Sequence, residues 1–557
     1  MRLSHRLILL SLAVIRLVWA QPDTDWWRHA VIYEIYPRSF ADTNGDGVGD
    51  LNGITKHLDY LTTLGVDAIW ISPFFPSPQV DFGYDISDYR AIDPRYGTMA
   101  DFDRLQEEAN KRHIRLILDF VVNHTSDKHP WFVESRSSRT NPKADWFVWR
   151  DAKPDGKPPN NWQSIFGHSA WQWEPARKQF YYHAFYKEQP DLNWRNPEVR
   201  KAMYDVMRFW MNKGVAGFRL DAVTSLFEDL KLRDESTRPG RNAYGEPIVS
   251  REYTDNLQEL HDVLREMRQV TNEYPGRVLI GETYVPNVGE LAKMYGPKND
   301  ELQLPMDTQF GFLNRLSADA FRAKLRDAEA GLHGNVPLLV FDNHDNPRSW
   351  NRYGDGAHNM EIAKLLAALL LTPRAVSLMY YGQEIGMENN DPKRIEDVQD
   401  PIGRIGWPKE IGRDGERTPM QWTSGPEAGF TTGKTTWLPI PPSYQAHNVQ
   451  VEERDPKSLF HFYTTLIRLR KDNAALRDGS FELVNENDSN VLTYVRKSPQ
   501  GQMVLVALNF TASPRTESYK VGKDSTTLLS TFASAGAKVD LKKLELPAFG
   551  VYIGEIK

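Results

Sequence analysis

The stretch Gly-Phe-Arg-Leu-Asp-Ala-Val at residues 217–223 is a short apolar run that ends in a carboxylate. Two later stretches repeat the pattern: Val-Leu-Ile-Gly-Glu-Thr-Tyr at 278–284 and Phe-Asp-Asn-His-Asp-Asn-Pro-Arg at 341–348. They place Asp221, Glu282 and Asp345 where a strand should meet a loop. Because a buried carboxylate is costly unless it is paired or used, these three strand ends predict one shared polar pocket.

Apolar runs of strand length alternate with amphipathic stretches from residue 30 to about residue 390. The runs are 31–36, 68–72, 115–122, 217–220, 278–281, a weak one near 303–310, 336–341 and 375–381. The helical stretches between them include 54–64, 101–112, 197–212, 255–271 and 360–371. This alternation is typical of a parallel sheet covered by helices. Eight strands predict a (β/α)8 barrel; a doubly wound open sheet is the alternative, and no glycine-rich dinucleotide motif supports it.

Two connections are too long to be simple loops. Residues 125–194 predict a small domain inserted after the third strand, and a second insertion at about 384–440 should lie over the barrel mouth. From residue 477 the pattern changes to short strands, which predicts an antiparallel β-sandwich at 477–557. The barrel itself is then expected at 21–124 and 195–476.

Composition excludes several classes of protein. Residues 1–20 read as a secretory signal, with Arg2 and Arg6 before an apolar segment, and imply export to the periplasm or medium. The net charge of −6 becomes more negative when this segment and its three arginines are removed, which argues against nucleic acid or anionic membranes as partners. No later segment predicts a membrane span. The chain has no cysteine, so disulfides cannot support the exported fold.

In a (β/α)8 barrel the active site lies at the carboxyl ends of the strands, and polar clusters fall at these positions throughout the chain. Any one of them alone is better explained as a strand-end ion pair or cap. Together they resemble the α-amylase family of glycoside hydrolases, in its α-glucosidase and oligo-1,6-glucosidase branch. The resemblance rests on Asp119-Phe-Val-Val-Asn-His124, Gln189-Pro-Asp-Leu-Asn193, Gly217-Phe-Arg-Leu-Asp221, Gly281-Glu282 and Asn343-His-Asp345.

The resemblance implies three catalytic residues. Asp221 is expected to be the nucleophile of a retaining reaction and Glu282 the general acid and base, with their carboxyls about 5–5.5 Å apart. Asp345 is expected to bind sugar hydroxyls and stabilise the transition state. Arg219 lies two residues before Asp221 on the same strand face, so it should keep the nucleophile ionised.

The same resemblance implies a closed sugar pocket and therefore exo action. Tyr84 is expected to stack on the terminal sugar ring, and Asp81 to bind its 4-hydroxyl together with Arg417. His124 and His344 are expected to bind other hydroxyls. The inserted domain is expected to contribute Phe166, Phe185 and Gln189, although packing explains the two phenylalanines equally well.

A loop after the first strand reads Asp42-Thr-Asn-Gly-Asp-Gly-Val-Gly-Asp50. Alternating oxygen ligands around glycines suit a hard cation, although Gly53 stands where an EF-hand has its glutamate. The family resemblance implies a structural Ca²⁺, or alternatively Mg²⁺. The expected ligands are the side chains of Asp42, Asn44, Asp46 and Asp50 and the carbonyl of Val48. A polar turn with Asx caps is the alternative.

Substrate preference depends on Ala222. Within this branch a valine after the nucleophile accompanies α-1,6 preference, so alanine favours α-1,4 links such as those of maltose and short oligosaccharides. The alternatives are an oligo-1,6-glucosidase, a sucrose-acting relative, a glucosyl-transferring isomerase of the trehalose synthase kind, a sugar-binding module and a catalytically silent scaffold. The sequence does not fix the oligomeric state.

Overall fold

The computed structural model describes residues 24–557. The expected signal segment at 1–20 lies outside these residues and stays a prediction. Across residues 24–557, every helix is too short or too polar to cross a membrane.

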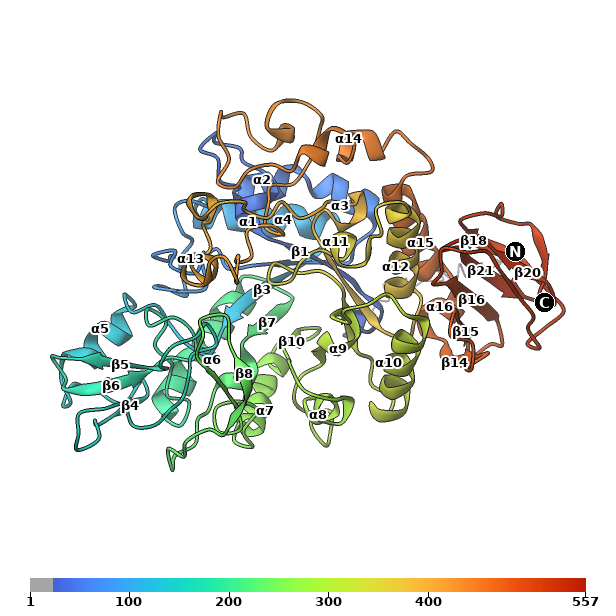
Figure 1. Cartoon of the computed structure of the whole chain (residues 1–557). Coiled ribbons are helices and arrows are strands. Elements are labelled where there is room, and N and C mark those ends of the chain that lie inside the picture. Colours follow the sequence, from blue (N-terminus) through green and yellow to red (C-terminus); the bar gives the residue numbers. More distant parts are fainter. Residues whose placement is uncertain (1–23) are drawn as a thin grey trace, which may run out of the picture.

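Eight parallel strands close into a barrel, which confirms the predicted fold (Figure 1). Each expected apolar run forms a strand, including the weak sixth one. In chain order the strands are β1 (Val31–Ile35), β2 (Ala68–Ile71), β3 (Arg115–Val121), β7 (Gly217–Asp221), β10 (Val278–Gly281), β11 (Leu304–Asp307), β12 (Leu338–Val340) and β13 (Val376–Tyr380). The barrel closes where β1 pairs in parallel with β13, with Val31 opposite Ser377.

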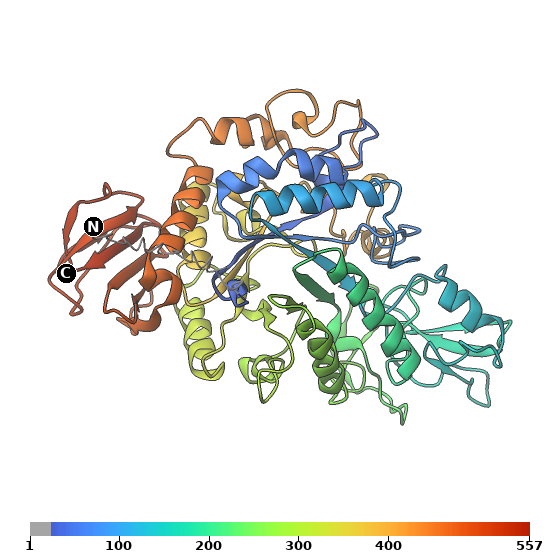
Figure 2. The ribbon, with the colours of Figure 1, turned by 180° about the vertical axis from the view of Figure 1, so that it is seen from behind.

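Helices cover the outside of the barrel (Figures 1 and 2). They are α2 (Leu51–Lys56), α3 (Leu58–Leu64), α4 (Met99–Lys111), α6 (Pro197–Asn212), α7 (Leu260–Asn272), α10 (Ala318–Gly331), α12 (Asn359–Leu371) and α15 (Leu459–Asp472). Helix α6 shows why they form: Pro197 occupies the first turn, and the Asn196 side chain accepts the Glu198 N–H. The expected helix at 54–64 is divided at His57, and the one expected from 255 begins at Leu260.

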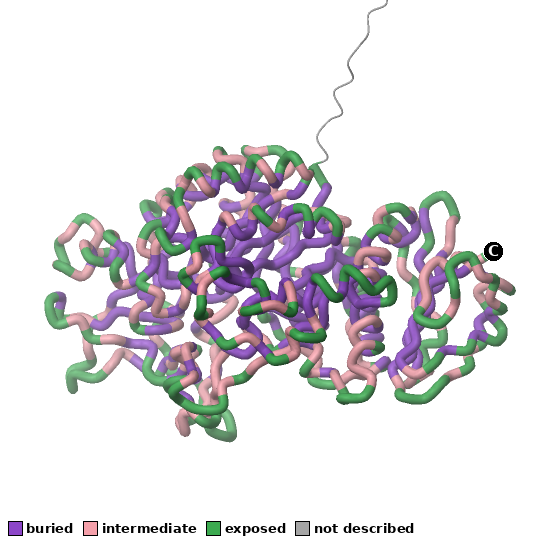
Figure 3. Tube along the Cα trace, turned by 90° about the horizontal axis from the view of Figure 1, so that it is seen from above, coloured by how far each residue is buried: buried purple, intermediate pink, exposed green. Residues whose placement is uncertain are grey.

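Period-two alternation gives the strands two different faces. Outward side chains pack under the helices, while inward side chains at the base of the barrel, such as Ile32, Ile117, Val278 and Leu338, form a separate apolar cluster. The next inward position, two residues farther along each strand, is charged. It is Glu34 after Ile32 in β1 and Asp119 after Ile117 in β3. The buried trace through the barrel is visible in Figure 3.

A small domain is inserted between β3 and α6. It contains α5 (Pro130–Ser137) and a three-stranded sheet ordered β4 (Trp149–Arg150), β6 (Gln179–Tyr182), β5 (Trp171–Glu174). Aromatic residues including Trp162 and Phe180 form its own core. A hairpin of β8 (Thr237–Arg241) and β9 (Pro247–Val249), which follows β7, reaches this domain through Glu246, whose carboxylate accepts the His168 N–H at 2.8 Å.

The C-terminal region is antiparallel, as predicted, but its two layers are unequal. A six-stranded sheet is ordered β14 (Ser480–Val484), β15 (Val491–Lys497), β16 (Met503–Asn509), β21 (Val551–Ile556), β18 (Asp524–Ser530), β19 (Lys538–Asp540). The second layer has only β17 (Arg515–Glu517) and β20 (Leu544–Leu546). Both faces of the large sheet are buried, because Val504 and Val506 join the main core while Leu505 and Ala507 pack with Leu544.

Candidate active site

A cavity of about 770 Å³ opens at the carboxyl ends of the barrel strands. The expected residues that line it are Asp81, Tyr84, His124, Phe166, Phe185, Asp221, Glu282 and Asp345. The second insertion also contributes, through Ile402, Ile411 and Arg413, so the expectation that it covers the barrel mouth is correct.

Arg219 joins the two carboxyls proposed to catalyse the reaction. Its Nη1 lies 2.5 Å from Oδ1 of Asp221, and its Nη2 lies 2.7 Å from Oε1 of Glu282. Nη1 also donates to Asp119 at 3.1 Å. The Arg219 side chain is fully buried, and its guanidinium lies 4.8 Å from the centre of the Trp70 ring. One buried cation therefore balances three strand-end carboxyls.

Burial makes these carboxyls weaker acids than usual. It raises the pKa of Asp221 to about 7 and that of Glu282 to about 7, against the attraction of Arg219 in both cases. Burial also raises the pKa of Asp119 to about 6. Proton exchange near neutral pH is therefore within reach of the Asp221 and Glu282 pair, which titrates as a coupled unit.

The backbone after Asp221 fixes the position of Glu282. Ala222 adopts φ 46° and ψ 34°, a left-handed conformation that is unfavourable for a residue with a Cβ. In this conformation its N–H donates to Oε2 of Glu282 at 2.8 Å. Ala222 also lines the cavity, so its side chain occupies part of the space beside the two carboxyls.

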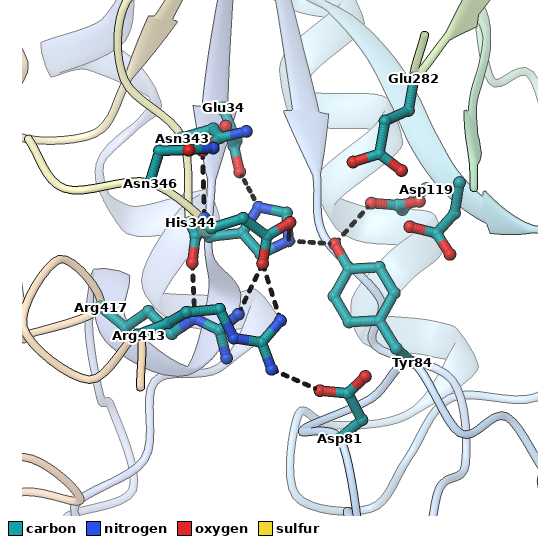
Figure 4. Close-up of polar contacts among 12 residues, drawn as sticks. Glu34, Asp81, Tyr84, Asp119, Glu282, Asn343, His344, Asn346, Arg413 and Arg417 are labelled. Atoms are coloured by element: carbon teal, nitrogen blue, oxygen red, sulfur yellow. Dashed lines mark hydrogen bonds and ion pairs between the residues drawn. The ribbon is translucent and has the colours of Figure 1, made fainter. Parts of the chain in front are cut away.

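Two arginines, Arg413 and Arg417, which are labelled in Figure 4, hold Asp345 as an anion. Arg413 and Arg417 each donate to its Oδ1 at 2.9 Å. Burial would raise the pKa of Asp345, but attraction from His344 and these arginines outweighs it and holds the pKa below its usual range.

The structure corrects the expected partner of Asp81. Arg413 donates to Asp81 at 2.9 Å, whereas the fully buried Arg417 donates instead to the His344 carbonyl and to Asp345. Arg417 therefore supports Asp345 from behind. Arg413 belongs to the second insertion and was not among the expected site residues. It lines the cavity beside Asp81, and its guanidinium lies 5.5 Å from the Phe166 ring centre.

Gln189 and His344 also lie behind the cavity wall and are at most 1% exposed. Gln189 donates to Asp81 at 3.2 Å and contacts His124 at 3.0 Å. His344 Nε2 lies 2.6 Å from the Tyr84 hydroxyl. These contacts position Asp81, His124 and Tyr84 at the cavity, and direct contact of Gln189 and His344 with sugar stays a prediction.

Glu34 is a further supporting residue that sequence reasoning missed. Its carboxyl lies 2.6 Å from Nδ1 of His344 and is completely buried in β1 (Figure 4). The Tyr84 hydroxyl, in turn, donates to Asp119 at 2.9 Å. The available signal was a lone charged residue in the apolar run 31–36, a pattern that indicates a paired or functional group.

The loop expected to hold Ca²⁺ is stabilised by its own hydrogen bonds. Asp42 accepts the N–H groups of Gly45 and Gly47 at 2.8 Å, and Asp50 accepts that of Thr43 at 2.8 Å. Among residues 24–557, no three or more His, Cys, Asp or Glu residues gather closely enough to hold a metal. Asn44 and the Val48 carbonyl offer oxygen ligands of a suitable kind. The cation site stays a prediction.

A (β/α)8 barrel with paired buried carboxyls in a cavity at its strand ends has the architecture of a glycoside hydrolase. The chain belongs to the α-amylase family, because the family model "Alpha amylase, catalytic domain" matches residues 34–479.

Relatives of this family resemble the chain along most of its length. A probable α-glucosidase from Rhizobium meliloti (strain 1021) is 46% identical over 86% of this chain and 88% of its own length. An oligo-1,6-glucosidase from Parageobacillus thermoglucosidasius is 39% identical over 96% and 99% of the two chains. Among solved structures, an α-glucosyl transfer enzyme has a TM-score of 0.89 at 41% identity, covering 96% and 99%. A trehalulose synthase from Pseudomonas mesoacidophila MX-45 has a TM-score of 0.88 at 36% identity, covering 96% and 99%.

Proposed function

We propose that the protein is a retaining, exo-acting α-glucosidase that hydrolyses terminal α-1,4-linked glucose from maltose and short oligosaccharides. The observation that carries this proposal is the Arg219 guanidinium, which holds the carboxyls of Asp221 and Glu282 at the same cavity. One buried cation keeps the two acids side by side, within reach of one glycosidic bond.

Asp221, ionised beside Arg219, attacks the anomeric carbon while Glu282 gives its proton to the leaving oxygen. The glycosidic bond breaks and a glycosyl–Asp221 ester forms. Glu282, now ionised, removes a proton from water, and the resulting hydroxide releases the sugar and restores both carboxyls. Enzymes that use this retaining mechanism have their two carboxyls about 5–5.5 Å apart, which is the separation predicted for Asp221 and Glu282.

The pKa values predict a bell-shaped dependence of rate on pH. Activity should fall below neutrality as Asp221 gains a proton, and above neutrality as Glu282 loses its own, since burial raises both pKa values to about 7. The midpoints belong to the coupled pair rather than to either residue.

Exo action is supported by the closed end of the cavity. Asp81, Arg413 and Phe166 come from three separate segments and meet there. Paired charges leave oxygen and nitrogen atoms to bind hydroxyls of a terminal ring, and we expect the contact between Asp81 and Arg413 to stop a longer chain from passing through.

Preference for α-1,4 links rests on Ala222. Its left-handed backbone directs a small side chain into the cavity beside Asp221 and Glu282. A β-branched residue there would fill more of this space and would add backbone strain.

The test is a time-resolved proton NMR assay of purified protein with maltose, isomaltose, sucrose and trehalose supplied separately. We expect the non-reducing ring of maltose to be released as α-glucose, beyond the mixture of anomers that the reducing ring contributes, and no measurable turnover in the Asp221→Ala variant. Release of the non-reducing ring as β-glucose would overturn retention. Faster cleavage of isomaltose would overturn the linkage preference. Turnover by Asp221→Ala at more than a tenth of the wild-type rate would overturn the assignment of the nucleophile.

Glucosyl transfer is the second candidate activity, supported by the cavity mouth. Ile165 is 45% exposed and Tyr284 is 49% exposed, and both line the cavity near the half-buried Ile402 and Ile411. An apolar wall favours an organic acceptor over water at the glycosyl ester. The solved α-glucosyl transfer enzyme and trehalulose synthase fit this alternative. Oligosaccharide products at high maltose concentration would reveal transfer, whereas glucose as the only product would exclude it.

A structural Ca²⁺ in the loop 42–50 is part of the same proposal. Calcium added to chelator-treated protein should raise Tm, because a ligand that binds only the folded state stabilises it by about 2.7 kcal/mol at 100 times its Kd. Asp46→Ala should remove this response. An unchanged Tm at millimolar Ca²⁺ would favour the alternative, a polar turn stabilised by its own hydrogen bonds.

A further inference from the structure

A second cavity of about 660 Å³ lies between the barrel and the inserted domain and shares no lining residue with the catalytic cavity. We call it the junction cavity. Its walls are the loop 87–90, the start of α5 with Trp146, and part of α6. Figures 1 and 2 show α6 running beside the inserted domain.

Three aromatic rings line the junction cavity. The Trp131 ring lies 5.0 Å from that of Trp146 and 6.1 Å from that of Tyr89, measured between ring centroids. Trp146 and Tyr89 are buried, while Trp131 is only partly buried. Trp131 is held in place by the rings of Trp146 and Tyr89. It therefore presents an apolar surface that loses little further conformational freedom when a ligand binds.

The polar groups of this cavity do not add up to one strong charge. Asp88, Glu198 and Asp205 are balanced in part by Arg90 and Lys201. Lys201 pairs with Asp205 at 2.6 Å, and the Glu198 carboxylate accepts the indole N–H of Trp146 at 3.2 Å. This mixture offers donors and acceptors side by side, and it favours a neutral polar ligand over a strongly charged one.

His129 supplies a fixed hydrogen-bond donor. Its Nδ1 accepts the Trp131 N–H at 3.1 Å, so the ring proton is on Nε2. Burial lowers the pKa of His129 to about 3, and the ring therefore stays neutral at the pH of the catalytic reaction. The Nε2–H remains as a donor at the cavity wall.

We propose that the junction cavity is a second carbohydrate site that binds a neutral oligosaccharide. A sugar ring has apolar C–H faces and a rim of hydroxyls, which match the aromatic rings and the mixed polar groups of this cavity. The inference goes beyond the proposed hydrolysis, because it requires no turnover. The Tyr89 hydroxyl donates to the carbonyls of Val121 and His124 at 2.9 and 2.8 Å, which places this site directly behind the segment that carries His124 to the catalytic cavity.

The test uses tryptophan indole signals in ¹⁵N-labelled, full-length Asp221→Ala protein titrated with maltotriose. Trp131 and Trp146 report on the junction cavity. Trp70, whose indole N–H donates to Asp119 at 3.2 Å, reports on the catalytic cavity. Trp173 lies on β5 of the same inserted domain, is 38% exposed and lines neither cavity, so it is the control. Tryptophan-to-phenylalanine variants assign the four signals.

We expect Trp131 and Trp146 to shift with a saturation curve of their own, while Trp173 does not move. Trp131→Ala should weaken the Trp146 response at least 10-fold and leave the Trp70 response unchanged, whereas Trp173→Ala should change neither. Movement of Trp70 without Trp131 and Trp146 would overturn the second site but leave the glucosidase proposal standing. Shifts of Trp131 and Trp146 without Trp70 would support the second site and count against the glucosidase. Shifts with inorganic phosphate but not with maltotriose would also overturn a neutral-sugar site.

Discussion

The two ends of the barrel interior are built from the same strands but have opposite physical character. At the base, Ile32, Ile117 and Val278 form an apolar cluster. Two residues farther along β1 and β3, the inward positions carry Glu34 and Asp119, which are at most 1% exposed. One strand repeat of about 6.6 Å therefore separates hydrophobic packing from buried charge.

This contrast shows where stability and reactivity are located. The base gains free energy by removing apolar surface from water. The mouth loses free energy by burying carboxyls, as the raised pKa values of Asp221 and Glu282 demonstrate. Changes at the mouth should therefore affect activity out of proportion to stability, and changes at the base should do the reverse.

The largest expected effect is at the mouth. Asp221→Ala should lower kcat for maltose by roughly 10⁴-fold or more, because no other group replaces a lost nucleophile. Steady-state kinetics will measure it, with circular dichroism as the control for folding. A variant that keeps more than a tenth of the activity would place the nucleophile elsewhere.

Arg219→Met should lower both the stability of the fold and the catalytic activity. Removing the buried cation leaves Asp119, Asp221 and Glu282 without their shared partner, and breaking a buried ion pair from one side typically costs about 3–5 kcal/mol. Chemical denaturation will measure the loss of stability. Arg219→Lys is the matched variant: it keeps the charge but loses the fork that reaches both carboxyls, so it should recover stability more than kcat. Equal stability of Arg219→Met and the wild type would remove Arg219 from its balancing role.

At the base, Ile117→Ala should cost about 2–4 kcal/mol through lost burial and the cavity left behind. The kcat of the folded variant at 25 °C should stay within about twofold of the wild type, since Asp119 and Arg219 keep their partners. Thermal unfolding and initial rates, measured on the same preparation, test the two statements together. A large fall in kcat with little loss of Tm would show that the two ends are not independent.

The smallest effect is a gain of stability on removing a charge at the mouth. The pKa of Glu282 is raised on folding, so its contribution to stability is fully present below its unfolded pKa and is lost as pH rises through about 7. Glu282→Gln should therefore be more stable than the wild type at pH 8 by roughly 1–3 kcal/mol. At pH 4 the two proteins should differ little. Tm measured across this range is the test, and a pH-independent difference would contradict the assigned cause.

Patterns in the sequence predicted the barrel because each buried parallel strand is a continuous apolar run. Period two also placed Arg219 and Asp221 on one face correctly. The pairing of Asp81 with Arg413 was not predictable, because Arg413 and Arg417 lie in the same irregular insertion and only its folded path decides which of them faces Asp81. The hairpin of β8 and β9 was missed because every β8 residue is exposed and no apolar alternation marks it.

The C-terminal sheet has a consequence for how the protein is made. Its strand β21 comes last in the sequence of this sheet yet lies inside it, between β16 and β18. Ribosomal synthesis therefore delivers β14 to β20 before the strand that joins them. Until then β16 and β18 each present an unpaired edge. The surface of α12 that packs against β16 and β21 is also incomplete until then. Completion of the barrel's outer packing on this side therefore follows the synthesis of residues 551–556, and the edges of β16 and β18 stay open to other chains until that point.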